Sequence, residues 1–430
     1  MLQAVTAPNP HGADAAGAAI LARATDAFER RLDPASRAPL AVGFSGGGDS
    51  LALLLAARAW ARSSGRPLLA LIVDHRLRPQ GRAWTEAAAR TAAALDVGFR
   101  ALAWEGAKPG AGVQAAARRA RHALLAKGAR EAGASVVLLG HTRDDRSEAA
   151  WMRAQGSSVG DPREWSPSPA WPEGRGVFLL RPLLDLGRVE LRGLLEPSGL
   201  EWIEDPANQD PRHLRSLARL RASGEPPPRP SDPLSEAFTV DACGTVHLER
   251  DASRRLIAMA CVSAGGGDRL PRGEVIDRLA GRLAAGEAFT ATLAGARIEA
   301  GRELIVGRDA GRLAAAGAPL AEGHPVVFDG RFEVAAHGEG LLVQPLGGLL
   351  SRLEKPSRLA LGAFPPSARR TLPAVVDADG TVSCPILAGS AWASARCLVG
   401  DRLEAACGRI ARESPLAAGS HGGQGAGALS

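Results

Sequence analysis

Short apolar segments alternate with helical patterns along the first half of the chain. The apolar segments are residues 40–44, 68–73, 99–104, 136–139 and 177–180. Each has the length and composition of one buried strand. Helical patterns occur between or after them, at residues 51–60, 113–132 and 188–195. Strands that alternate with helices in this way predict a parallel sheet with right-handed crossover connections, and hence an α/β fold.

Polar side chains gather directly after three of these predicted strands. They are found in residues 45–50, in the pair Asp74 and His75, and in residues 141–145. In open parallel sheets, ligands bind beyond the carboxyl ends of the strands. The sequence therefore predicts one ligand site built from these three segments.

The pattern changes after residue 223. Residues 224–235 read GEPPPRPSDPLS and include five prolines, which disfavour both helix and sheet and predict an extended linker. Two helical patterns follow, at residues 252–262 and 273–285, and then runs typical of hairpins. One such run covers residues 325–343 and is expected to turn at Asp329 and Gly330.

These observations predict a modular protein. We expect a variable N-terminal extension and helix over residues 1–38, a catalytic domain over 39–223, a proline-rich linker over 224–236, a helical and mixed module over 237–320, a β-rich module over 321–417, and a disordered tail over 418–430. The C-terminal modules would be small and of mixed α+β type.

The loop from Gly43 to Ser50, with the sequence GFSGGGDS, almost matches the Walker A pattern G-x-x-x-x-G-K-S, but it has Asp49 in place of the lysine. A glycine-rich turn that opens a helix still offers backbone N–H groups and the positive end of a helix dipole to phosphates. A carboxylate beside a triphosphate is repulsive unless Mg²⁺ bridges the two. Asp49 therefore predicts a metal-bridged nucleotide.

The same loop fits the S-G-G-x-D-S pattern of PP-loop ATP pyrophosphatases, which cleave ATP between its α and β phosphates. Further segments resemble the tRNA(Ile)-lysidine synthetase family, and together they run from about residue 40 to 220. The matching segments are Val73-Asp74-His75-Arg76-Leu77-Arg78, Ala117-Arg118-Arg119-Ala120-Arg121-His122, Gly140-His141-Thr142-Arg143-Asp144-Asp145 with Glu148, Arg181-Pro182-Leu183-Leu184 and Asp205-Pro206-Ala207-Asn208.

The chain departs from the family pattern at several positions. It has His122 where the family usually has tyrosine, and residues 146–149 read RSEA in place of Q-x-E-T. The glycine-rich stretch that normally follows is altered at residues 155–161. The asparagine of the motif R-N-x-[IL]-R is replaced by Ser216, between Arg215 and Arg219. These departures change the polar residues expected to line that part of the site.

The resemblance implies a Rossmann-like, adenine nucleotide alpha hydrolase-like fold and a specific reaction. The family joins free L-lysine to carbon 2 of the wobble cytidine of isoleucine tRNA with a CAU anticodon, through an adenylated cytidine, and releases AMP and pyrophosphate. The cofactors implied are ATP and Mg²⁺. The partners implied are this tRNA and lysine, and the sequence allows a homodimer without specifying one.

The resemblance also implies roles for individual residues. ATP would be bound by Ser45, Gly46, Gly47, Gly48, Asp49 and Ser50, and Mg²⁺ by Asp49 and Asp145. Catalytic roles fall to Asp49, Arg118, His141, Asp144, Asp145 and Glu148, with Asp144 and Glu148 as candidates to deprotonate the lysine amine. Substrate-binding roles fall to Asp74, His75, Arg78, Arg121 and Arg181.

Composition adds further expectations. The net charge of +6, mostly from arginine, suits a polyanionic partner, although a compositional bias of the genome explains it equally well. Candidate tRNA-contacting residues in the second half are Arg254, Arg255, Arg269, Arg272, Arg278 and Arg282. There is no apolar run of about 18 residues that would suggest a membrane span. The chain start lacks a secretory signal pattern, so we expect the protein in the cytoplasm.

Three other functions fit parts of the pattern. A tRNA thiolase of the same superfamily would need reactive cysteines in the catalytic half, but all five cysteines follow residue 240 and none has C-x-x-C spacing. An amide-forming synthetase, such as an NAD or GMP synthetase, does not account for the segment Asp74 to Arg78. A tRNA- or nucleotide-binding protein without activity would retain tRNA affinity but release no pyrophosphate.

Overall fold

The structure is a computed structural model, and it describes residues 10–157, 159–205, 214–222, 233–313, 316–387 and 390–414. Most of the predicted linker (residues 224–232), the predicted tail (418–430) and the segment Pro206-Ala207-Asn208 lie outside the described residues. The chain forms two compact units: Met1–Ser231 together with Ala411–Ser430, and Asp232–Ile410. Each unit is described by itself.

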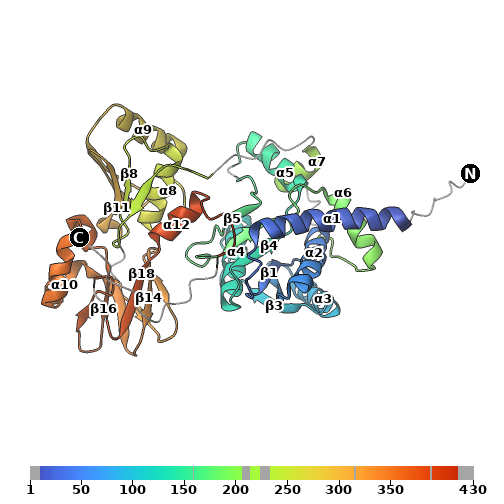
Figure 1. Cartoon of the computed structure of the whole chain (residues 1–430), viewed down its shortest axis with the longest axis horizontal. Coiled ribbons are helices and arrows are strands. Elements are labelled where there is room, and N and C mark those ends of the chain that lie inside the picture. The colour runs from blue at the N-terminus through green and yellow to red at the C-terminus, as the bar shows by residue number, and fades with distance from the viewer. Residues whose placement is uncertain are drawn as a thin grey trace, which may run out of the picture. The chain divides into compact units, whose positions relative to one another are not determined.

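The first unit is built on a six-stranded sheet with the order β3-β2-β1-β4-β6-β5 (Figure 1). Its strands are β1 (Leu40–Gly43), β2 (Leu68–Asp74), β3 (Gly98–Ala103), β4 (Val136–Leu139), β5 (Trp165–Pro167) and β6 (Phe178–Leu180). All neighbouring pairs are parallel except β5 with β6, which is antiparallel and closes one edge. The predicted parallel α/β sheet is therefore confirmed, and the short edge strand β5 is an addition to it.

Helices cover both faces of this sheet. They are α1 (Pro10–Arg31), α2 (Gly48–Ser64), α3 (Gly81–Ala94), α4 (Val113–Glu131), α5 (Arg143–Ala154), α6 (Arg188–Leu195) and α7 (Leu214–Arg221). On one face, Leu40 and Val42 of β1 pack in a core with side chains of α1, α2, α3 and α6. On the other face, Ala41 packs in a second core with side chains of α4. The alternation of side chains along each strand thus produces a three-layer arrangement.

A short segment from the end of the chain completes the first unit. Glu413 lies beside Arg66, which shortly precedes β2, and its two carboxylate oxygens accept hydrogen bonds from the Arg66 guanidinium at 2.7 and 2.9 Å. Both side chains are almost fully buried, at 0% and 1% exposure. The Ser135 hydroxyl and the backbone N–H of Asp33 donate to the same carboxylate. We call this contact the C-terminal clasp.

The second unit contains three antiparallel sheets, with the orders β7-β8-β11-β10-β9, β12-β15-β16-β17 and β13-β14-β18. The strands are β7 (Phe238–Val240), β8 (Val246–Leu248), β9 (Phe289–Leu293), β10 (Ala296–Ala300), β11 (Leu304–Arg308), β12 (Ala318–Leu320), β13 (Val326–Phe328), β14 (Phe332–Ala336), β15 (Leu341–Pro345), β16 (Pro373–Val376), β17 (Val382–Ser383) and β18 (Ala393–Cys397). The helices are α8 (Arg254–Gly265), α9 (Gly273–Ala284), α10 (Lys355–Ala360), α11 (Pro366–Arg369) and α12 (Val399–Ala406).

Two hydrophobic cores hold this unit together. The first packs α8, α9 and α12 against the five-stranded sheet, and the second fills the space around the two smaller sheets. Both helices predicted here from the sequence are present, and the hairpin of β13 and β14 turns at Asp329 and Gly330, which have positive φ angles of 49° and 66°. Among the described residues of both units, no helix is long and apolar enough to cross a membrane.

Candidate functional site

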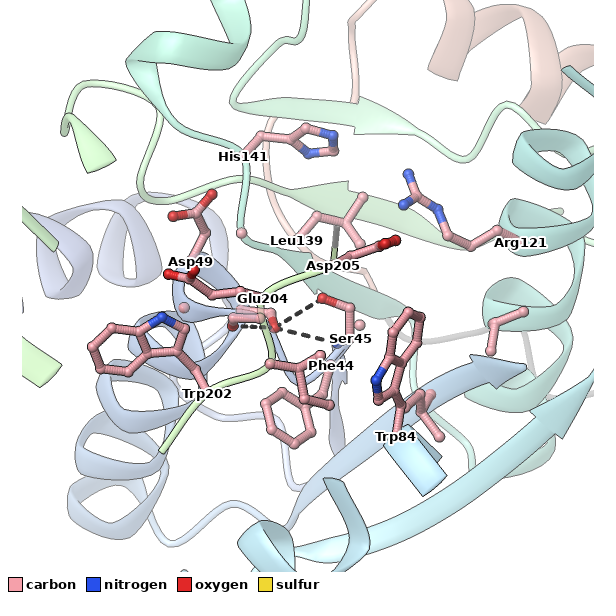
Figure 2. Close-up of a pocket in the computed structure, with 18 of the residues that line it drawn as sticks. Phe44, Ser45, Asp49, Trp84, Arg121, Leu139, His141, Trp202, Glu204 and Asp205 are labelled. Carbon is pink, nitrogen blue, oxygen red and sulfur yellow. Dashed lines mark hydrogen bonds between the residues drawn. The ribbon is translucent and has the colours of Figure 1, made fainter. Parts of the chain in front are cut away.

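A cavity of about 940 Å³ opens in the first unit at the carboxyl ends of β1, β2 and β4. The three polar segments noted in the sequence all contribute to its lining, together with residues of α6, α7 and the loop around Trp202. In Figure 2, Arg121 and His141 lie above Ser45, while Trp84 and Trp202 lie below it on opposite sides. The glycine-rich loop therefore lies between two tryptophan side chains, with Arg121 and His141 on another side of the cavity.

The glycine-rich loop is held in a fixed shape by one hydroxyl group. The Ser50 hydroxyl donates to the Gly47 carbonyl at 2.8 Å, accepts from the Ser45 backbone N–H at 3.2 Å, and lies 3.1 Å from the Ser45 hydroxyl. Gly46 has a φ of +80°, and its carbonyl accepts from the backbone N–H of Ile203 at 2.8 Å. A side chain at Gly46 would be both strained and too close to Ile203.

The loop leads into α2 with the first turn of the helix open to the cavity. Gly47 is the N-cap residue, and no side chain caps the helix there. The first N–H groups of a helix have no partner within the helix, and together with the helix dipole they attract anions. This geometry suits a phosphate chain lying across residues 45–50.

The loop after β4 packs directly on the start of α2. A Cβ atom built on Gly140 would lie 2.8 Å from the carbonyl oxygen of Asp49 and 3.2 Å from the Cα of Ser50. Real Cβ atoms do not approach backbone atoms this closely. Glycine at position 140 therefore permits the contact that sets the spacing between the phosphate-binding loop and His141.

Three carboxylates lie on the side of the cavity formed by α5 and α6. Asp145 is buried, and its Oδ2 accepts from the backbone N–H and the hydroxyl of Thr142 at 2.8 and 3.0 Å, which caps α5. Burial works to raise the pKa of Asp145, but its cationic surroundings hold it well below its ordinary value. Burial raises the pKa of Asp49, and the nearby Asp145 adds to that effect. Glu148 is buried beside them.

Three arginines neutralise these carboxylates, and none of them had been predicted as a site residue. Arg188 donates to all three acidic side chains, and Arg215 donates to Asp145 at 2.5 Å and to Glu148 at 3.3 Å. Arg219 adds a contact of 3.2 Å to Glu148. Arg215 and Arg219 carried a signal in the altered R-N-x-[IL]-R motif. Arg188 carried none, because an arginine at the start of a helix is an ordinary surface residue.

His141 faces the cavity as a neutral imidazole. Burial, followed by the positive charge of Arg181, lowers the pKa of His141 well below its usual value of 6.5. The Nε of Arg181 donates to the Nδ1 of His141 at 3.2 Å. Because Nδ1 accepts this bond, the proton of the neutral ring is on Nε2, which leaves an N–H donor for a ligand. Arg121 lines the same wall, and its Nε is buried without a hydrogen-bond partner in the described structure.

The remaining predicted residues are distributed around this centre. Asp74, His75, Asp144 and Arg78 line the cavity, and Arg78 pairs with Asp205 at 2.7 Å. Glu148 and Arg181 lie behind the lining residues, each in contact with one of them. Arg118 is exposed and is not one of the residues that line the cavity. The sequence analysis missed Trp84, Trp202 and Glu204, all of which line it.

The carboxylates fit a magnesium ion that is shared with a nucleotide. Among the described residues, no three histidine, cysteine, aspartate or glutamate side chains converge to form a metal cage. Magnesium is commonly held by one or two carboxylates, with substrate phosphates and water completing its coordination. Asp49 and Asp145 supply such a pair beside the phosphate-binding loop, and Arg188 contacts both of them.

Comparison with known proteins identifies the class to which this site belongs. Residues 21–223 match the family model of the PP-loop domain. The first unit is therefore a PP-loop, ATP-binding domain, and the second unit is an addition to it.

Relatives that match most of the chain define the family. The tRNA(Ile)-lysidine synthase of Caulobacter vibrioides is 49% identical over 399 residues, which cover 90% of this chain and 98% of that protein. The one from Hyphomonas neptunium is 38% identical over 62% of this chain and 80% of that protein. The chain belongs to the tRNA(Ile)-lysidine synthase family. This confirms the resemblance and the prediction of a ligase that forms a carbon–nitrogen bond.

Similarity to solved structures is weaker. The U34-tRNA thiolase NcsA from Methanococcus maripaludis matches with a TM-score of 0.39 and 16% sequence identity, over 48% of this chain and 71% of that chain.

Proposed function

We propose that the protein uses ATP to join free L-lysine to carbon 2 of the wobble cytidine in isoleucine tRNA with a CAU anticodon. The relatives named above, with sequence identities of up to 49%, are tRNA(Ile)-lysidine synthases. The observation that carries the proposal is the uncapped start of α2 beside Asp49, which suits a metal-bridged ATP at the edge of a cavity with room for more than a nucleotide.

Nucleotide binding follows from the charges around the loop. The triphosphate would lie across residues 45–50, where the N–H groups of α2 point outward. Arg121 and Arg215 bring positive charge to the cavity wall on the His141 side. Asp49 and Asp145 would hold Mg²⁺, which neutralises the charge that develops on the departing pyrophosphate. Each of these contacts becomes stronger as the transition state forms.

The first chemical step would be adenylation of the tRNA base. The 2-carbonyl oxygen of cytidine attacks the α-phosphorus of ATP, and the bond to the bridging oxygen of pyrophosphate breaks. The Nε2–H group of neutral His141 is available to donate a hydrogen bond to the phosphates. The product is a cytidine activated at carbon 2, with pyrophosphate released.

The second step would be attack by lysine. The ε-amine attacks carbon 2 in its neutral form, the bond between carbon 2 and the AMP oxygen breaks, and a protein group takes the proton. Asp144 suits this role better than Glu148. It lines the cavity, whereas Glu148 lies behind it and accepts hydrogen bonds from Arg188, Arg215 and Arg219. We assign Asp144 as the base and Glu148 as the anchor of the three arginines.

The second unit would bind the body of the tRNA. Arg269, Arg272 and Arg278 are exposed residues around the start of α9. Arg254 and Arg282 are already paired, with Asp277 at 2.6 Å and with Glu287 at 2.8 Å. We therefore propose that Arg269, Arg272 and Arg278 contact tRNA phosphates, which fix orientation without reading sequence.

A sulfur-transferring alternative finds no support in the cysteines. All five lie in the second unit, and four are buried. Burial raises the pKa of Cys243, Cys261 and Cys384 to about 12, so their thiols stay protonated at neutral pH. A thiol that is not ionised is a poor nucleophile.

The test is incorporation of radiolabelled lysine. Purified protein is incubated with ATP, Mg²⁺, labelled lysine and isoleucine tRNA with a CAU anticodon, and acid-insoluble label is counted. We expect label that requires ATP and disappears when the wobble cytidine is replaced. Asp49→Ala should abolish incorporation, while Glu131→Ala, at an exposed pair with Arg100, should not change it. Label with the parent but equal label with Asp49→Ala would refute the role of Asp49.

Absence of label would separate the alternatives. ATP cleaved to AMP and pyrophosphate without lysine incorporation would retain adenylation chemistry and point to another acceptor. Binding of tRNA without pyrophosphate release would indicate a non-catalytic binding protein.

A further inference from the structure

Arg188 links all the acidic side chains at the centre of the site. It is the first residue of α6, and its Nε lies 3.2 Å from Asp49 Oδ2, its Nη2 3.1 Å from Asp145 Oδ1, and its Nη1 2.6 Å from Glu148 Oε1. Its backbone N–H donates to Asp144 Oδ2 at 2.9 Å. A single arginine thus contacts residues from α2 and from the first turns of α5.

The guanidinium groups in this cluster equal in number the carboxylates that they contact. Asp49, Asp145 and Glu148 contribute three negative charges, and Arg188, Arg215 and Arg219 contribute three positive charges. A divalent cation that approaches these three carboxylates alone therefore also meets the positive charge of three arginines. The oxygens best placed for it, on Asp49 and Asp145, already accept hydrogen bonds from Arg188.

We propose that Arg188 is a tethered cation that occupies the metal position until the metal arrives with a nucleotide. The inference rests on the proposed function, because the nucleotide brings the phosphates to which Arg188 transfers its hydrogen bonds. The Arg188 side chain is 19% exposed and lines the cavity, so phosphates on the adjacent loop are within its reach once the carboxylates bind the metal. Arg188 is a positioning residue: it occupies the carboxylate oxygens and so keeps solvent and free metal from binding them.

The other two arginines are suited to stay in place during this exchange. Arg215 and Arg219 lie on α7 and hold Glu148, which does not line the cavity, and Arg215 also donates to Asp145 Oδ1 at 2.5 Å. After Arg188 leaves, two arginines face three carboxylates, and the net charge of −1 favours the metal. Binding of the metal and binding of the nucleotide become coupled, because the metal takes the carboxylates from Arg188 and the nucleotide phosphates accept the hydrogen bonds that Arg188 then has to donate.

The test measures metal binding without any nucleotide, tRNA or lysine. Mn²⁺, a substitute for Mg²⁺, is titrated into the full-length protein and free Mn²⁺ is followed by electron paramagnetic resonance. Arg188→Gln should bind Mn²⁺ at least about tenfold more tightly than the parent, because one positive charge is removed within about 4 Å of the site. Arg143→Gln is the matched control, since Arg143 contacts Glu190 at the start of α6 and none of the three carboxylates.

Each outcome decides the proposal. Unchanged or weaker Mn²⁺ binding by a folded Arg188→Gln protein would overturn it. If that variant does not fold, Arg188→Lys replaces it. Lysine keeps the charge but loses the planar fork, so we expect affinity to rise by a smaller factor, about threefold, and parent-like affinity would count against the proposal. If Arg188→Gln binds Mn²⁺ more tightly while the parent protein incorporates no lysine, this inference stands and only the proposed function is refuted.

Discussion

The contact between Gly140 and the phosphate-binding loop makes Gly140→Ala a sensitive test of the site. The added Cβ would lie 2.8 Å from the Asp49 carbonyl oxygen and 3.0 Å from its carbonyl carbon. Neither neighbour is a flexible side chain, so the loop or the start of α5 must move by about 0.7 Å to restore ordinary contact distances near 3.5 Å. Overpacking of this kind destabilises a folded protein by about 1–3 kcal/mol.

The larger effect should be on catalysis. A displacement of about 1 Å in a positioned group can reduce a rate by about a hundredfold, so a shift of about 0.7 Å should reduce kcat/KM for lysidine formation by about tenfold or more. ATP affinity from calorimetry should also fall, because the N–H groups of α2 move with Asp49. Gly193→Ala is the control: an added Cβ there has no neighbour within 4 Å, and alanine is favoured over glycine inside a helix. Parent-like kcat/KM and ATP affinity in Gly140→Ala would refute the argument that this contact positions the loop.

Two further predictions concern stability of the first unit. Glu413→Gln leaves the Arg66 guanidinium buried without its counter-ion, so it should reduce the free energy of unfolding of the first unit by about 3 kcal/mol. This free energy is measured by urea unfolding, from the transition that moves to higher urea when ATP is added. Glu86→Gln, at an exposed ion pair, should change it by less than about 0.5 kcal/mol, and equal changes in the two variants would contradict the stabilising role of the clasp. Burial, then the charge of Arg121, lowers the pKa of His122 from 6.5 to about 2 in the folded state, so the unfolded chain binds the extra proton and stability falls as pH drops below 6.5. His122 should account for about 1.4 kcal/mol lost between pH 7.5 and 5.5, and His122→Tyr should remove that loss; identical pH slopes would refute it.

The strands β1, β4 and β6 could be predicted because they are short, continuous apolar runs that are buried on both faces. The helices α3 and α5 could not be predicted by the same rule. The first is rich in alanine, and the second begins with charged residues that the sequence analysis assigned to the site. The antiparallel edge strand β5 has only three residues, too few for a periodic pattern.

The site was predictable only where its residues belong to a motif. Asp49, His141 and Asp145 stand out because they follow strands or glycines at a recognised spacing. Arg188 and Trp202 come from segments that approach the loop only in the folded chain, and no local pattern distinguishes them from surface residues. The pairing of Arg66 with Glu413 was invisible for the same reason.

The C-terminal clasp also has a consequence for how the protein is made. Its two partners are 347 residues apart in the sequence, so Arg66 emerges from the ribosome long before Glu413 has been synthesised. During that interval the guanidinium of Arg66 has no carboxylate to enter the core with, and all of residues 232–410 are synthesised before Glu413 is added. We therefore expect the ATP-binding unit, although most of its sequence is translated first, to form this contact only after the sequence of the second unit has been made. A chain cut before residue 413 would carry the phosphate-binding loop on a unit that lacks the clasp.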